Sequence, residues 1–88
     1  MLEMVKLKLQ ITESDFDSLL NVFINSAKLD LGIAGVTTID ETDDAIIDCI
    51  CSFVDWKFNH DDEMRKVYEM QKAQFITATG YTTWSNEE

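Results

Sequence analysis

The feature that most constrains the fold of this chain is the absence of proline from all 88 residues, which also include only three glycines, Gly32, Gly35 and Gly80. Proline and glycine are the residues that most strongly interrupt regular secondary structure. With so few of them, the sequence favours helices joined by a few polar turns. A chain of this length forms a single domain, because chains divide into several cores only well above this size.

The first long helical segment follows Thr12 and ends near Gly32 and Gly35. Thr12 can cap its start, and acidic residues fill the first turn, where the helix dipole favours negative charge. Glycines often close helices in this way. The apolar residues of this segment recur at helical spacing and form one stripe. They are Phe16, Leu19, Leu20, Phe23, Ile24, Ala27 and Leu31.

The second helical segment, at about residues 43–58, is apolar almost all round. Such a helix lies either at the centre of its own domain or between subunits. A protein this small can hardly surround a helix completely, so the sequence favours self-association. Trp56 and Phe58 near the end of this helix are core residues by default, and their alternative role, as candidates for the subunit interface, follows from the enrichment of aromatic residues in interfaces.

A long connecting loop, residues 36–43, precedes the second helix, and Asp40 or Thr42 can supply the helix cap. The polar turn at residues 59–62 contains aspartates that can cap a third helix, which stops at Gly80. We therefore expect three main helices, with the long loop between the first and the second.

The N-terminal stretch is ambiguous from its pattern. Val5, Leu7, Leu9 and Ile11 alternate as the residues of a strand would, whereas Leu2, Val5 and Leu9 also suit one face of a helix. Periodicity does not decide between the two.

No arrangement of side chains in the sequence supports catalysis, a cofactor or a metal site. Cys49 and Cys51 would lie about 200° apart around a helix, so they cannot bond to each other and are expected as small buried hydrophobes. The only histidine, His60, falls in a turn, and adjacent aspartates at helix starts are capping residues by default. We therefore expect a protein that is not an enzyme.

The charge balance excludes further classes. Seventeen acidic and seven basic residues produce a net charge of −10, so binding of nucleic acid through a basic face is excluded. The 45% apolar content is too high for a disordered acidic tail, and no apolar run or signal-peptide pattern indicates a membrane. The acidic surplus has three readings: solubility, an electronegative channel lining, or mimicry of DNA at a basic cleft.

Several pieces of the sequence, taken in order, resemble a known family. Residues 26–36 read SAKLDLGIAGV and are followed by IDETD at 39–43, by an apolar helix ending in WKF at 56–58, and by YEMQK at 68–72. This order is similar to that of the small head–tail connector, or adaptor, proteins of tailed bacteriophages. The likeness extends over roughly residues 2–81.

The resemblance implies an all-α bundle whose N-terminal stretch is a short helix, in one connector domain at residues 1–80, followed by a polar and aromatic tail at 81–88. It also implies a non-enzymatic virion protein, made in the bacterial cytoplasm and placed at the head–tail junction. Copies would form a cyclic ring on the portal protein, extend the DNA channel and carry a head-completion or tail protein. DNA would pass through the ring without specific binding.

Two sets of residues are candidates for roles in such a ring. Tyr81 and Trp84, in the tail, are candidates for docking to the portal or a neighbouring protein. Four acidic residues of the long loop and the start of the second helix are candidates for facing the channel: Asp40, Glu41, Asp43 and Asp44. The alternative function is a small acidic regulator or DNA mimic that binds a basic cleft of a host protein.

Overall fold

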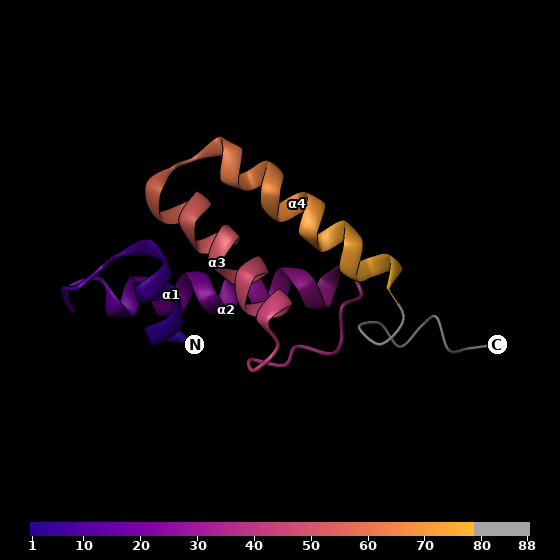
Figure 1. The fold of residues 1–88 in the computed structure, drawn as a ribbon, viewed down its shortest axis with the longest axis horizontal. Coiled ribbons are helices and arrows are strands. Elements are labelled where there is room, and N and C mark those ends of the chain that lie inside the picture. The colour runs from indigo at the N-terminus through magenta and orange to yellow at the C-terminus, as the bar shows by residue number, and fades with distance from the viewer. Residues whose placement is uncertain (79–88) are drawn as a thin grey trace.

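The computed structural model describes residues 1–78, and this part of the chain consists of four α-helices without a strand. The helices are α1 (Leu2–Leu9), α2 (Asp17–Ile33), α3 (Asp44–Asn59) and α4 (Asp62–Thr77). The all-α class is confirmed, with a short N-terminal helix, three main helices and a long loop at residues 34–43 between α2 and α3 (Figure 1). The expected tail at 81–88 lies outside the described residues.

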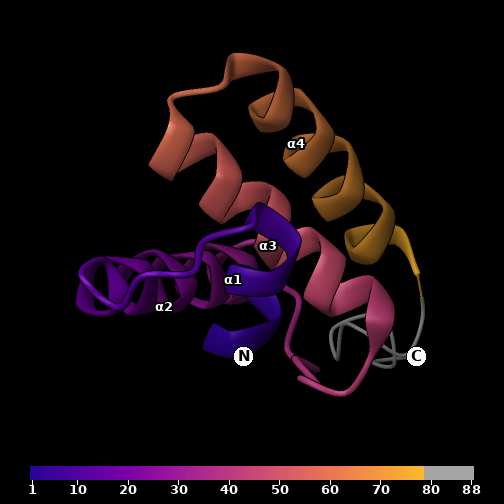
Figure 2. The same cartoon turned by 60° about the vertical axis from the view of Figure 1, so that its left-hand side comes forward.

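α3 lies at the centre of the bundle. Figure 2 shows it between α2 and α4, and α1 packs against both α2 and α3. Eight of its residues are buried, namely Ile46, Ile47, Cys49, Ile50, Cys51, Ser52, Phe53 and Val54. The other three helices therefore cover α3 within one chain. Of the two placements that the sequence allows, the structure shows the centre of the helix's own domain, because the short α1 closes the side that α2 and α4 leave open. Self-association itself stays a prediction.

The ends of α2 differ from those that the sequence predicts. The helix begins at Asp17, with Phe16 as its N-cap and no side-chain cap, so Thr12 does not cap it. The residues before it form a turn, closed by a hydrogen bond from the Asp17 N–H to the carbonyl of Ser14. At the other end the helix continues through Gly32, and only Gly35, with φ of 106°, adopts a backbone conformation that favours glycine.

Aspartate caps begin α3 and α4. Asp43 and Asp61 each accept a hydrogen bond from the backbone N–H two residues further on, at 2.9 and 3.0 Å. The cap of α3 is therefore Asp43. The prediction from the sequence that Asp40 or Thr42 caps this helix is wrong. For α4, the sequence predicts that the helix stops at Gly80, but it ends earlier, at Thr77.

Both cysteines behave as the sequence predicts. Cys49 and Cys51 are buried in α3 and are not joined in a disulfide. Burial raises the pKa of the Cys49 thiol to about 12 and that of Cys51 to about 11. Both thiols therefore stay protonated at neutral pH, so they pack as small apolar groups and do not act as nucleophiles.

Candidate protein–protein interaction surface

Helix α2 carries two apolar faces. Its inner face is buried in the core and consists of Leu20, Ile24, Ala27 and Leu31. Its outer face is exposed and consists of four large apolar residues with a serine at the centre. These are Leu19 (44% exposed), Val22 (58%), Ser26, Leu29 (67%) and Ile33 (77%). The sequence places Leu19 in one apolar stripe with the buried residues of the inner face, but the helix turns this side chain outward.

Most of the exposed large hydrophobic residues of the described chain lie in its first 33 residues, and four of them form the outer face of α2. Within residues 1–78, seven of the eight exposed large hydrophobic residues come from the segment 4–33, and the exception is Met70 on α4. Single exposed apolar residues are ordinary on protein surfaces, whereas a contiguous apolar patch marks an interaction site. The geometry thus makes the outer face of α2 the candidate site for a protein partner.

The charged residues of α2 are each paired within the chain. Asp17 lies 2.8 Å from the ammonium group of Lys6, Lys28 binds Glu41, and Asp30 lies 3.0 Å from the ammonium group of Lys72. Between Asp17 and Lys28 the helix carries no charged side chain. In a chain of net charge −10, α2 is therefore a locally neutral element.

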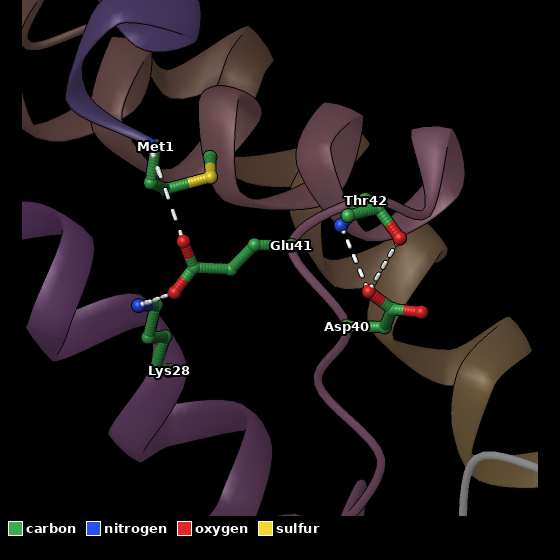
Figure 3. A network of polar contacts seen from close by, with 5 residues as sticks. All are labelled: Met1, Lys28, Asp40, Glu41 and Thr42. Carbon is green, nitrogen blue, oxygen red and sulfur yellow. Dashed lines mark hydrogen bonds and ion pairs between the residues drawn. The ribbon is translucent and has the colours of Figure 1, made fainter.

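Glu41 holds the long loop against α2. Lys28 donates a hydrogen bond to one oxygen of its carboxylate, and the amino group of Met1 lies 3.9 Å from the other (Figure 3). The hydrogen bond from Lys28 lowers the pKa of Glu41. The loop is also anchored by Val36, which is fully buried, and by Ile39, which packs against the core. Of the expected channel-facing acids, Glu41 is thus turned toward a cation of its own chain.

Asp40 and Asp43 have local structural contacts. One oxygen of the Asp40 carboxylate accepts hydrogen bonds from the backbone N–H and the hydroxyl of Thr42, at 2.9 and 2.7 Å, which close a turn in the loop (Figure 3). These hydrogen bonds lower the pKa of Asp40. Asp43 caps α3, and Asp44, in the first turn of that helix, is exposed. Asp40, Glu41 and Asp43 therefore lie in the loop and each has a contact of its own, whereas Asp44 begins α3.

A second polar cluster joins α2 to α4. The hydroxyl of Tyr68, which is fully buried, donates a hydrogen bond of 2.6 Å to Asp30, and Lys72 donates another of 3.0 Å to the same oxygen. Burial alone would raise the pKa of Asp30, but the hydrogen bonds from Tyr68 and Lys72 outweigh it and lower that pKa. The fold thus brings together residues from two separate pieces of the pattern that suggested the connector family, AKLDL and YEMQK.

Trp56 and Phe58 are half-buried and make aromatic contacts inside the chain. The Trp56 ring lies 5.3 Å from that of Phe53, and the ammonium group of Lys57 lies 4.2 Å from its centre. Phe58 packs edge-to-face on Phe16, at 5.2 Å. These contacts favour the core alternative for both rings. The docking candidates Tyr81 and Trp84 lie outside the described residues.

Two hollows of the described surface are lined by charged side chains. The larger, of about 340 Å³, lies between α1 and the start of α2 and is lined by Leu2, Glu3, Lys6, Leu7, Ile11 and Asp17. The smaller, of about 220 Å³, is lined in part by Lys8 and Asp48, which form an ion pair of 2.9 Å across it, and by Cys51. Each hollow is lined by one ion pair, Lys6 with Asp17 in the larger and Lys8 with Asp48 in the smaller, and by one further acidic residue, Glu3 and Asp55 respectively.

The described part of the chain contains neither a metal-binding cluster nor a membrane span. Among residues 1–78, no group of three His, Cys, Asp or Glu side chains is arranged to hold a metal ion. None of the four helices is both long and apolar enough to cross a membrane.

Comparison with known proteins found no matching family model, no matching curated protein and no matching solved structure. The function is therefore inferred from the residues and from the geometry of this chain alone.

Sequence reasoning missed the outer face of α2, although a signal for it was present. Positions 19, 22, 26, 29 and 33 alternate in steps of three and four, which is the spacing of one helix face that contacts a partner. The inner stripe overlaps with it along the chain, so the two faces look like a single broad apolar region in the sequence.

Proposed function

We propose that the protein is a non-enzymatic adaptor of a tailed-bacteriophage head–tail junction, in which copies of the chain form a closed ring on the portal and extend the DNA channel. The observation that carries the assembly role is the outer face of α2, with side chains that are 44–77% exposed. A surface of this kind is costly for a free protein to expose and is useful only where another protein covers it.

Two further features support the phage assignment. The first is the ordered resemblance at residues 26–36, 39–43 and 68–72. The second is the contact of Asp30 with Tyr68 and Lys72, because it supplies a physical reason for the two separated motifs to occur in one sequence. A cyclic ring requires head-to-tail contacts, so the outer face would meet a different surface of the neighbouring copy.

The alternative function, a DNA mimic, needs acidic groups that are free to imitate phosphates. Several carboxylates of this chain have other contacts: Asp43 and Asp61 cap helices, and Asp17, Asp30 and Glu41 pair with lysines. These contacts weigh against the mimic. They also leave Asp40 and Asp44 as the channel-facing candidates that have neither a helix-capping role nor a lysine partner among the described contacts.

The test of the adaptor proposal is binding to a portal protein. We expect portal, capsid and tail reading frames beside the gene, and the purified portal of that locus should bind the full-length protein as a ring in native mass spectrometry. Leu29→Glu, on the outer face, should weaken portal-dependent ring formation at least tenfold. Met70→Glu, on α4 and similarly exposed, is the matched control and should leave it unchanged.

The proposal is overturned if the portal of the same locus does not bind the protein. Inhibition of a DNA-binding enzyme by the free protein, without any binding to a portal, would instead establish the acidic mimic.

A further inference from the structure

We infer that two copies of this chain pair through the outer faces of α2, antiparallel about a twofold axis that passes beside Ser26, before any ring is assembled. The inference goes beyond the proposed function, because it concerns the free protein. Its partner is a second copy of the same chain.

The spacing of the outer face is symmetric about its centre. Leu19 and Ile33 are each seven residues, or about two helical turns, from Ser26, while Val22 and Leu29 lie four and three residues from it. An antiparallel pair of α2 helices therefore sets Leu19 of one copy against Ile33 of the other, and Val22 against Leu29. A face with this symmetry is complementary to itself, as a twofold interface requires.

Charge identifies a second copy as an occupant that this face can accept. Two chains of net charge −10 repel each other over most of their surfaces. The outer face of α2 avoids this repulsion, since it carries no charged side chain and the charged residues of the helix, Asp17, Lys28 and Asp30, are each paired with an opposite charge of their own chain. The antiparallel arrangement also places the positive end of each helix dipole beside the negative end of the other.

The centre of the outer face permits close approach. Ser26 is small and exposed, so this position does not hold the partner helix away. The face extends from Leu19 to Ile33, which is about 21 Å of helix at 1.5 Å per residue. Two packed helices have axes about 8–10 Å apart, which would bring the two Ser26 Cα atoms to roughly 3.5–5.5 Å.

Pairing of this kind has a consequence for assembly. The face that pairs two free copies is also the face proposed to contact the next subunit in a ring. The dimer must therefore open before the ring forms, so that the free protein does not form rings away from the portal.

The first experiment measures self-association of the full-length protein by sedimentation equilibrium over a concentration series. We expect a monomer–dimer equilibrium. Val22→Glu should weaken it at least tenfold, because it adds two like charges near the axis, whereas Met70→Glu should leave it unchanged. Val22 and Met70 are 58% and 59% exposed, so the two substitutions are matched in exposure and should both leave the helical circular dichroism intact.

The second experiment locates the axis by disulfide trapping. Ser26→Cys should cross-link two copies under mild oxidation, since the upper part of the expected Cα separation, about 4.4–5.5 Å, lies within the range that a disulfide spans. Ser18→Cys is the matched control, because it is exposed on the same helix but would lie about 24 Å from its symmetry mate. The unaltered protein measures the background of the buried cysteines.

A protein that stays monomeric at every concentration overturns the inference. So does equal cross-linking at positions 18 and 26, which indicates a parallel pair, or the formation of larger species without cross-linking at 26, which indicates a head-to-tail contact. These outcomes leave portal binding untouched. Failure to bind the portal, in turn, leaves the dimer standing.

Discussion

At the residue scale, the carboxylate of Asp30 accounts for most of the polar connection between α2 and α4. It accepts hydrogen bonds from Tyr68 and Lys72, two residues that are one turn apart on α4. Tyr68 also packs its ring against Phe53 at 5.0 Å, so its apolar body belongs to the core while its hydroxyl needs this one acceptor. A buried hydroxyl without a partner is costly, which explains why its acceptor is an ionised group.

We predict that Tyr68→Phe lowers the free energy of unfolding by about 1–2 kcal/mol, because it removes a hydrogen bond to a charged group but keeps the ring. Urea denaturation measures the loss. A double-mutant cycle with Asp30→Ala should show coupling of at least ~0.5 kcal/mol between the two positions. Additive effects of the two substitutions would mean that the hydrogen bond contributes nothing.

Stability should also fall in acid because of Asp30 and Glu41. The pKa of each is lower in the folded protein than its ordinary value of 3.8 or 4.5, so the unfolded chain binds more protons in this range. Their contribution is therefore complete above the ordinary values and is lost as the pH falls through the lower, folded values.

The measurement is the urea midpoint at a series of pH values from ~6 down to ~2.5. Asp30→Asn should make the acid limb less steep, because this carboxylate no longer titrates. The same slope in the unaltered protein and in Asp30→Asn would contradict the assignment.

At the scale of the elements, the two glycines at the end of α2 have different roles. Gly32 lies inside the helix with open space around its Cα, whereas Gly35 follows the helix with φ of 106°. The backbone N–H groups of Gly35 and Val36 donate to the carbonyls of Gly32 and Leu31, at 3.1 and 2.9 Å, and turn the chain into the long loop. The end of α2 therefore depends on Gly35 alone.

Alanine substitutions at the two glycines should change the stability of the protein in opposite directions. Gly32→Ala should raise stability by up to about 0.5–1 kcal/mol, since alanine loses less entropy in a helix. Gly35→Ala should lower it by about 1 kcal/mol or more, because a Cβ is strained at positive φ. Thermal unfolding of both variants measures the difference, and two shifts of the same sign would contradict the separate roles of the two glycines.

At the scale of the whole molecule, the bundle is built around α3. The short α1 packs on α3 and α2 and closes the side of the core that three helices alone would leave open, with Val5 fully buried. Ion pairs then tie the periphery to the centre: Lys8 of α1 binds Asp48 of α3, and this pairing raises the pKa of Lys8. One small chain can therefore bury an almost wholly apolar helix.

Trp56 provides the test of this arrangement. Since its ring packs against Phe53 and lies 6.4 Å from that of Tyr68, we predict that Trp56→Ala destabilises the dilute monomer by about 2–3 kcal/mol, somewhat below the loss for a fully buried aromatic residue. Self-association should change little beyond the effect of this lower stability of the monomer. Calorimetry at low concentration, combined with sedimentation, separates the two effects. A variant with normal thermal stability but weaker association would place Trp56 in the subunit interface instead.

The sequence by itself determined the features that depend on neighbouring residues. Absence of proline and helical spacing of apolar residues predicted the three main helices, and aspartates at residues 61–62 predicted the cap of α4, because capping and periodicity act within a few residues. The burial of both cysteines followed from their place in an apolar helix. The ambiguous N-terminal stretch could not be decided in this way, since its pattern suits a strand as well as a helix.

Only the tertiary structure decided which apolar face of α2 is covered and which acids have partners. Leu19 and Leu20 are neighbours in sequence and equally apolar, but the packing of α2 on α3 buries one and exposes the other. The pairing of Asp30 with Tyr68, and of Glu41 with Lys28, joins residues 38 and 13 positions apart. Such contacts depend on how helices are oriented in space, and local propensity carries no information about that orientation.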